Sequence, residues 1–285
     1  MDIDTLIFSG GSVKGISFLG SIKYLIENNY IDERLKNIKK IYCVSASFLF
    51  VLSLILLNYD LNLLENEIIN FNISDMFNIN DISLKNFIND YGFINYNKSY
   101  ICIEKILKER YNCESISLLK LFKISGIHIV VKTVNVTQDK IEYIDHINNP
   151  KINLLKLIQM TTSIPLLVKP VKYKNNLYLD GGLSGNCPIE VNESEHYLCI
   201  EIIPNKNNKQ INNLFDFVIK GCELYSPDIL IRKYDKRNIK IDFSILNINL
   251  SSFNIDINTK KKILRMGYEQ TKEHFNHHQN HLNHH

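Results

Sequence analysis

Short and long apolar runs alternate along the first sixty residues of the chain. Thr5–Phe8 and Ile38–Cys43 are short and predict strands. The segment that begins at Ile16 carries apolar residues three and four positions apart, which predicts an amphipathic helix. Ala46–Leu57 is a longer apolar run and predicts a buried helix. Strand, helix, strand and helix in this order are typical of a parallel sheet with crossover helices.

The rest of the chain continues this alternation after a long stretch with a mostly helical pattern. That stretch, at about 61–121, comprises Leu61–Asn70, Ser83–Asn89, Ser99–Tyr111 and Ser115–Phe122. The pattern then predicts a strand at Ile127–Val134 with a hairpin partner at Asp139–Asp145, a helix at Ile152–Met160, and a hairpin at Tyr173–Leu179 with its turn at Asn175 and Asn176. After these it predicts a strand at Tyr197–Ile202, helices at Asn212–Tyr225 and Pro227–Tyr234, a strand near Ile239–Ile245 and a last helix from Asn258. The predicted class is α/β, with a central, mostly parallel sheet flanked by helices and a helical insert at about 61–121.

Length and composition are those of a globular protein with a substantial core. The chain has 285 residues, of which 45% are hydrophobic and 22% are charged. Its net charge of +3 is too small to indicate nucleic-acid binding, and no basic block is present. This mild basic balance is compatible with an anionic membrane surface without indicating one.

Compartment and membrane signals point to the cytoplasm. Six cysteines are scattered without C-x-x-C spacing, which favours reduced thiols over a zinc site or a disulfide framework. The acidic start, Met1–Asp4, runs directly into a strand and does not resemble a secretory signal. The apolar stretch Ile41–Leu57 falls just short of the roughly 20 residues of a membrane-spanning helix, and we interpret it as buried.

The chain ends in a segment rich in histidine and asparagine. Residues 271–285 hold six of the nine histidines. A metal-binding tract is one interpretation. We favour a low-complexity, disordered end, because nothing in the sequence organises these side chains in advance. The expected organisation is one domain at 1–270 and a tail at 271–285, with no metal site.

Three islands of residues could carry chemistry, and the first is a glycine-rich turn between the first strand and helix. It reads Gly10-Gly11-Ser12-Val13-Lys14-Gly15 and matches neither a Walker A loop nor G-x-G-x-x-G. Backbone N–H groups at a helix start can stabilise an oxyanion. A tight turn that lets helix and strand approach each other explains the glycines equally well.

The second and third islands are Ser45 and Asp180. Ser45 stands between a strand and a helix, where α/β hydrolases place a nucleophile, but taken alone it fits a helix N-cap better. Asp180 ends a strand and begins the turn Asp180-Gly181-Gly182. An ordinary Asp-Gly turn is one explanation. The other is a carboxylate placed to accept the proton of a serine nucleophile.

In this order and spacing, the three islands resemble the patatin-like phospholipase family, and most closely its versions from large DNA viruses. That family combines a G-G-G-x-K/R-G loop, a G-x-S-x-G elbow and a distant D-G-G or D-G-A. The resemblance runs from Thr5 to about Glu190, and it includes Thr161–Val171 before the aspartate and Asn186-Cys187-Pro188 after it. It implies a three-layer patatin-like fold.

The resemblance also implies roles for individual residues. Ser45 would be the nucleophile and Asp180 its base, with Gly10, Gly11 and Ser12 as the oxyanion hole. Residues that would support them are Lys14, Gly15, Ala46, Gly181 and Gly182. His128 and His196 would have structural roles. No cofactor is implied.

The chain departs from the family pattern at three positions. Ser12 replaces the third glycine of the loop, which matters little if its φ stays negative. Cys43 and Ser47 replace the two glycines of the elbow, where close packing surrounds a strained serine. A displacement of Ser45 by about 1 Å could cost roughly 100-fold in rate.

The resemblance leads to two hypotheses of different class. The first is a lipid acyl hydrolase of phospholipase A type, a serine esterase that acts through an acyl-serine intermediate. The alternative is a catalytically impaired relative that binds lipid or a partner protein, favoured by the lost glycines. A nucleotide-binding module is disfavoured, because the Walker lysine is missing. Expected partners are a phospholipid or other acyl ester and a peripheral membrane surface, in the cytoplasm, or in the host cytoplasm for a viral protein.

Overall fold

The computed structural model describes residues 2–72, 77–78, 84–96, 101–203, 211, 217, 220–221, 237–246 and 255–282. The strands are β1 (Thr5–Phe8), β2 (Lys40–Val44), β3 (Phe77–Asn78), β4 (Gly92–Tyr96), β5 (His128–Asn135), β6 (Lys140–Ile144), β7 (Leu166–Val168), β8 (Val171–Tyr173), β9 (Asn176–Asp180), β10 (Tyr197–Ile203) and β11 (Asn238–Asp242). The α-helices are α1 (Ser17–Glu27), α2 (Ala46–Leu56), α3 (Leu61–Asn70), α4 (Leu84–Asp90), α5 (Ile101–Tyr111), α6 (Leu118–Ser125), α7 (Leu154–Thr161) and α9 (Ile257–Leu282), and the short 3-10 helices are η1 (Ser12–Ile16), η4 (Gly181–Ser184) and η5 (Pro188–Val191).

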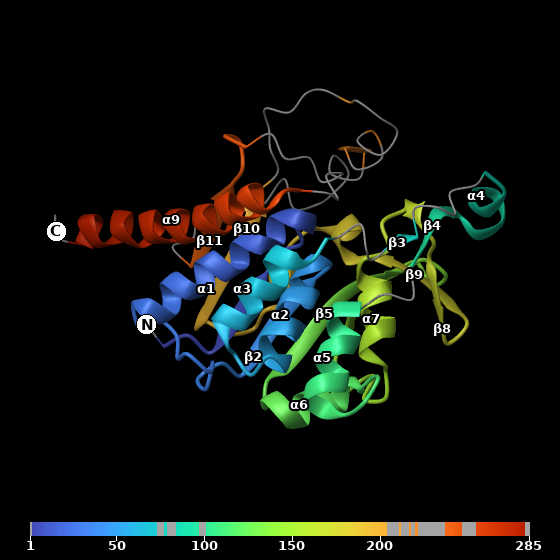
Figure 1. Ribbon diagram of the computed structural model, residues 1–285, viewed down its shortest axis with the longest axis horizontal. Helices are drawn as coiled ribbons and strands as arrows, with labels where there is room; N and C mark the ends of the chain where they lie inside the picture. Colours follow the sequence, from blue (N-terminus) through green and yellow to red (C-terminus); the bar gives the residue numbers. More distant parts are fainter. Residues whose placement is uncertain are drawn as a thin grey trace.

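A mostly parallel sheet forms the centre of the molecule, as the sequence predicts. Its strands run in the order β11-β10-β1-β2-β5-β9-β8, and β6 pairs with β5. The five strands from β11 to β5 are parallel, whereas β6, β8 and β9 are antiparallel to their neighbours. Helices α1, α2 and α3 lie beside one another, and α2 packs against β2 (Figure 1). The predicted α/β class with helices around a central sheet is confirmed.

Residues that alternate along each central strand bury their side chains in two different cores. In β1, Leu6 and Phe8 belong to the large core, whereas Ile7 joins a smaller cluster with Tyr42 and Val130. Both faces of the strands are therefore covered, which is why these strands read as continuous apolar runs and not as an alternation of apolar and polar residues.

The insert at 61–121 is helical where predicted, but it also contains strands that the sequence analysis missed. Helices α3, α4, α5 and the start of α6 match the predicted stretches. Between them, β3 pairs with β4, and β4 pairs in parallel with β7, far along the chain. These strands lie near α4 and β8, at the end of the molecule opposite the C-terminus (Figure 1). Strands this short take most of their stability from partners distant in sequence, so local periodicity does not reveal them.

The predicted hairpin before Asp180 exists, but its turn lies one residue earlier than predicted. Tyr173 pairs with Asn176, so the two turn residues are Lys174 and Asn175, with φ angles of 46° and 64°. Two positive φ angles are typical of a type I′ turn. This register places Tyr178 and Asp180 on the buried side, and a shift by one residue would expose them.

The C-terminal helix is much longer than predicted, and the expectation of a disordered end is wrong for residues 271–282. Helix α9 continues to Leu282 and runs along α1 (Figure 1). Thr271 is buried and donates a hydrogen bond to Ser21 of α1, 2.9 Å away. Phe275 is also buried and stacks on Tyr30, with 4.0 Å between ring centres. These tertiary contacts outweigh the polar composition. The predicted helices at 212–234 lie, apart from residues 217 and 220–221, outside the described residues.

The longest apolar stretch of the sequence does not form one element. It divides at Ser45 into the end of β2 and helix α2, which is buried on several sides. Within the part of the chain that the structure describes, no helix is both long and apolar enough to cross a bilayer.

Candidate functional site

Ser45 occupies the turn between β2 and α2 in a strained backbone conformation. Its φ and ψ angles are 56° and −130°. A positive φ in a residue other than glycine costs on the order of 1–3 kcal/mol and persists only where the surroundings enforce it. Thr161, at the end of α7, enforces it: its Oγ1 accepts a hydrogen bond from the Ser45 amide at 2.8 Å. The same hydroxyl donates to the Lys132 carbonyl at 2.9 Å.

The Ser45 hydroxyl does not cap the helix that follows it. Helix α2 has no hydrogen bond from a capping side chain at its N-terminus. The hydroxyl instead donates to Oδ2 of Asp180, 2.6 Å away and 135 residues further along the chain. The N-cap interpretation of Ser45 is therefore wrong.

Asp180 is held at the end of β9 by contacts on each side. Its amide donates to the Ser163 carbonyl at 2.9 Å, and its Oδ1 accepts from the Gly182 amide at 2.8 Å. The residue is only 6% exposed. Burial raises the pKa of this carboxyl to about 6, against the lowering effect of hydrogen bonds from Ser45 and Gly182 and of the Lys132 charge. A carboxylate with this pKa can accept a proton from a hydroxyl near neutral pH.

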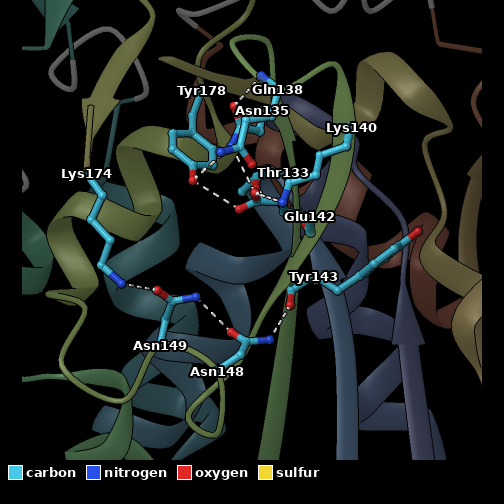
Figure 2. Close-up of polar contacts among 10 residues, drawn as sticks. All are labelled: Thr133, Asn135, Gln138, Lys140, Glu142, Tyr143, Asn148, Asn149, Lys174 and Tyr178. Atoms are coloured by element: carbon cyan, nitrogen blue, oxygen red, sulfur yellow. Dashed lines mark hydrogen bonds and ion pairs between the residues drawn. The ribbon is translucent and has the colours of Figure 1, made fainter. Parts of the chain in front are cut away.

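A polar network on the neighbouring strands fixes the register of β9. Tyr178 donates to Oε2 of Glu142 at 3.0 Å, and Asn135 donates to Oε1 of the same carboxylate at 2.9 Å. Figure 2 shows these three side chains from β9, β6 and β5 converging. Burial and Glu142 together raise the pKa of Tyr178 to about 12, so this tyrosine stays a hydrogen-bond donor. Two residues further along β9, Asp180 is held opposite Thr133.

A second chain of contacts in Figure 2 ties the hairpin turn to the segment after β6. Lys174 donates to Asn149 at 3.0 Å, Asn149 donates to Asn148 at 2.8 Å, and Asn148 donates to the Tyr143 carbonyl at 2.8 Å. The strand that ends at Asp180 is therefore anchored along its length.

The residues that replace the elbow glycines fit the elbow without displacing Ser45 from Asp180. Ser47 is fully buried, and its hydroxyl bonds both to the Val44 amide, at 2.9 Å, and to the Val44 carbonyl, at 2.8 Å. Cys43 is also fully buried, and burial raises the pKa of its thiol, so that the thiol stays neutral. Both side chains are small enough for the space between β2 and α2.

The glycine loop lies against Ser45, but one of its amides is already engaged. A Cβ on Gly10 would come within 3.5 Å of the Ser45 Cβ. The Gly10 amide donates to the Asn186 carbonyl at 2.8 Å, and the Gly10 carbonyl accepts from the Asn186 side chain at 2.9 Å. Gly10, which the resemblance places in the oxyanion hole, therefore does not offer its own N–H group as a donor: that group fastens the loop to the segment after Asp180.

The next loop residues differ from one another in conformation. Gly11 is extended, with φ at 178°, whereas Ser12 has φ at 49°. The condition that φ stays negative at Ser12 is not met, so this serine takes a left-handed conformation that glycine would adopt without strain. Neither the Gly11 amide nor the Ala46 amide at the start of α2 forms a hydrogen bond with another described residue.

The supporting residues named from the sequence have mainly structural contacts. The Lys14 side chain is buried, with its ammonium group 5.5 Å from the centre of the Phe243 ring. Gly15 lies beside the start of α2, but a Cβ there would meet the Ala46 Cβ at 3.6 Å, an ordinary van der Waals contact, so this approach does not require glycine. A Cβ on Gly181 would lie 2.3 Å from the Lys132 carbonyl oxygen, so that close contact requires glycine.

The two histidines considered earlier lie outside the Ser45–Asp180 pair. His128 pairs with Asp145 at 3.0 Å, and the His196 carbonyl accepts hydrogen bonds from the start of the chain. Over the described ranges, no group of three or more His, Cys, Asp or Glu residues could hold a metal ion. A groove of about 470 Å³ runs between β11 and α9, where Leu246 and Met266 line it, but it contains neither Ser45 nor Asp180.

The sequence analysis missed the residues that hold the pair in place. Thr161 and Ser163 together fasten the backbones of Ser45 and Asp180, but the sequence indicated them only as part of a segment that resembles the family. Asn186 was likewise indicated only by its place in a segment that resembles the family. Lys132 was not noticed at all, although a lysine in the middle of a strongly apolar strand is itself a signal of a buried charge.

Comparison with known proteins supports the family that the sequence resembles. The model of the patatin-like phospholipase family matches residues 6–192. Two viral proteins are similar along most of their length: the uncharacterized protein R571 of Acanthamoeba polyphaga mimivirus, at 23% identity over 95% of this chain and 93% of the relative, and the probable lipid hydrolase 463L of Invertebrate iridescent virus 6, at 23% identity over 88% and 78%. The resemblance to viral versions is confirmed.

Solved structures agree on the fold. VipD from Legionella pneumophila matches with a TM-score of 0.54 and 15% identity, over 98% of this chain and 67% of that protein. The type III effector ExoU matches with a TM-score of 0.56 and 10% identity, over 97% of this chain and 53% of that one, so the present chain spans about half of ExoU. From its sequence match and its fold, the chain belongs to the patatin-like phospholipase family.

Proposed function

We propose that this protein hydrolyses fatty acyl esters of lipids, as a phospholipase A-type serine esterase with a Ser45–Asp180 dyad. Membership of the family and similarity to a viral protein named as a probable lipid hydrolase support lipid hydrolysis. The observation that carries the dyad is the 2.6 Å hydrogen bond from the hydroxyl of a strained elbow serine to a buried carboxylate.

In the first half of the proposed reaction, Asp180 accepts the Ser45 hydroxyl proton while Oγ attacks the ester carbonyl carbon. The tetrahedral intermediate collapses, the bond to the alcohol breaks, and Asp180 returns the proton to the departing alcohol. In the second half, water attacks the acyl-serine and gives its proton to Asp180. The fatty acid leaves, and the proton returns to the Ser45 oxygen.

The oxyanion of each tetrahedral intermediate needs N–H donors that have no other partner. We assign the amides of Gly11 and Ala46 to this role, because neither bonds to another described residue and both adjoin Ser45 or its neighbouring loop. Removing one such donor typically costs 10²–10³ in kcat, so these amides are a large part of the proposed catalysis.

The substrate class also implies where the protein works. A long-chain acyl ester resides in a bilayer, so the proposal includes peripheral contact with a membrane surface. The scattered cysteines favour a reducing compartment, and we propose the cytoplasm.

The test compares wild type with Ser45→Ala on phospholipid vesicles and on short acyl esters, together with labelling by a fluorophosphonate that traps reactive serines. We expect wild type to hydrolyse lipid and take the label at Ser45, and the variant to do neither. Ser53→Ala, on the same helix, is the matched control and should behave as wild type.

Equal hydrolysis by wild type and Ser45→Ala would overturn the proposal. Wild type without hydrolysis or labelling, but with vesicle binding equal to that of Ser45→Ala, would establish the alternative of a lipid-binding relative without catalysis.

A further inference from the structure

Lys132 places a positive charge inside the sheet, in the middle of strand β5. Its side chain has no exposed surface. The ammonium group donates to the carbonyls of Ser184, at 3.1 Å, and Gly185, at 2.8 Å, and to Oε1 of Glu190, at 2.6 Å. All three donors of the ammonium group are therefore used. A buried charge costs several kcal/mol unless it is paired in this way, so the arrangement is specific.

The contacts of Lys132 lie on both sides of the candidate site. The ammonium group binds the turn that begins directly after Asp180 and leads to Asn186, which fastens the Gly10 loop. The main-chain carbonyl of Lys132 accepts the hydrogen bond of Thr161, which in turn holds the Ser45 amide. One residue thus connects the surroundings of the serine and the aspartate.

Few charged or titratable groups face this region. Among the described elements packed around Lys132, β9 contributes Asp180 of the candidate site, and η5 contributes Glu190, the counterion of Lys132. Tyr143 of β6 donates a short hydrogen bond to Glu190, and Tyr96 of β4 interacts electrostatically with Asp180. Lys132 lowers the pKa of Asp180 by its charge, against the larger effect of burial. It is the only cation that affects Asp180 in this set.

We infer that Lys132 is a positioning residue for the Ser45–Asp180 pair: it holds the turn after Asp180 and favours the ionised carboxylate. The inference rests on the proposed function. Without this charge, Asp180 would need a higher pH to act as a base, and the turn that carries Gly182 and Asn186 would lose its support.

The test uses three variants that change the charges of the Lys132–Glu190 pair. Lys132→Met removes the cation, Glu190→Gln removes its counterion, and the double variant removes both. The pKa of Asp180 is read directly by carbon-13 NMR of labelled aspartate, and the acid limb of the kcat/KM profile is read with it. We expect this pKa to be highest in Lys132→Met, followed by the double variant, wild type and Glu190→Gln. The loss of kcat/KM in Lys132→Met should be larger at pH 6 than at pH 9, by about fivefold if the pKa of Asp180 rises by one unit from about 6.

The control is Lys172→Met, which removes an exposed lysine on strand β8, beside β9, and should leave both readouts as in wild type. A purely structural role would lower stability without this order of pKa values, and an Asp180 pKa unchanged in all variants overturns the inference. If Lys132→Met does not fold, the double variant and Glu190→Gln keep the test decisive, because they should move the pKa of Asp180 in opposite directions. The NMR readout needs no activity, so it separates this inference from a failure of the proposed function.

Discussion

The residues around Ser45 and Asp180 hold each of them in an energetically unfavourable state. The serine is held at a positive φ, and the carboxylate is buried where its ionised form is disfavoured. Costs of this kind concentrate at functional sites, because reactivity requires groups to be kept out of their most stable environment. Substitution of either residue should therefore change the stability of the protein as well as its activity.

For Asp180, activity and stability should depend on pH in opposite directions. Its pKa of about 6 lies above the ordinary value of 3.8, so the base becomes active as pH rises through about 6, with roughly tenfold more activity per pH unit below that value. The folded state binds the proton more tightly than the unfolded state. This contribution to stability is full below pH 3.8 and is lost as pH rises through about 6.

The substitution Asp180→Asn tests both directions. It should abolish hydrolysis and raise the melting temperature at pH 8 by several degrees, because the ionised carboxylate costs on the order of 3 kcal/mol there. The gain should shrink toward pH 4, where wild-type Asp180 is protonated. Calorimetry at both pH values measures this difference, and a variant less stable than wild type at pH 8 would contradict it.

Thr161 should matter for rate more than its distance from the chemistry suggests. Thr161→Val keeps the shape of the side chain but removes the acceptor for the Ser45 amide and the donor to the Lys132 carbonyl. We expect kcat to fall by about 10- to 100-fold, since a shift of 1 Å in the nucleophile is that costly. Thr161→Ser keeps the hydroxyl and should retain most of the activity. Equal kinetics for the two variants would show that the hydroxyl does not position Ser45.

At the scale of elements, the junction of β2 and α2 shows how the chain replaces glycines in a tight elbow. Ser47 fills the space with a side chain that bonds to Val44, and Cys43 fills it with a neutral thiol. The family pattern puts glycine at both positions because close packing demands small residues. In this chain the same demand is met by small side chains with hydrogen bonds of their own.

Ser47→Gly would restore the family residue, but we expect it to weaken the protein. It removes the hydrogen bond that the hydroxyl accepts from the Val44 amide and the one that it donates to the Val44 carbonyl, and it adds backbone freedom at the start of α2. Together these changes should cost about 1–2 kcal/mol. Ser47→Ala separates the lost hydroxyl from the added freedom and should be intermediate. Urea denaturation and esterase assay measure both effects. A variant that is more active than wild type and equally stable would show instead that Ser47 impairs the elbow.

For the whole molecule, the C-terminal helix decides where the folded unit ends. Helix α9 packs along α1 through the buried residues Thr271 and Phe275, both beyond the boundary at 270 that the sequence predicts. The end of the chain thus contributes to the same core as its beginning.

Ending the chain after residue 270 should therefore destabilise the protein strongly, whereas ending it after residue 277 should preserve the core contacts. Phe275→Ala alone should cost about 3–5 kcal/mol, as is typical for a buried phenylalanine. Thermal unfolding of the three variants tests this, and a chain that ends at 270 with wild-type stability would restore the predicted boundary.

The sequence by itself predicted the order of elements along the chain and a central, mostly parallel sheet. These follow from local signals: buried strands read as apolar runs, and glycines and an Asp-Gly turn mark the chain's sharp bends. The pairing of Ser45 with Asp180 came from the resemblance to the family. Strands β3 and β4 and the exact hairpin turn escaped, because partners far along the chain stabilise them.

Only the tertiary structure decided whether the two side chains are in contact. The 2.6 Å contact joins residues 135 positions apart, and its supports, Thr161, Lys132 and Asn186, come from three further segments. The structure also shows that the Gly10 amide donates to Asn186, while those of Gly11 and Ala46 form no hydrogen bond with another described residue. Hydrogen bonds and buried charges depend on distances between atoms that folding brings together, and no local pattern along the chain contains those distances.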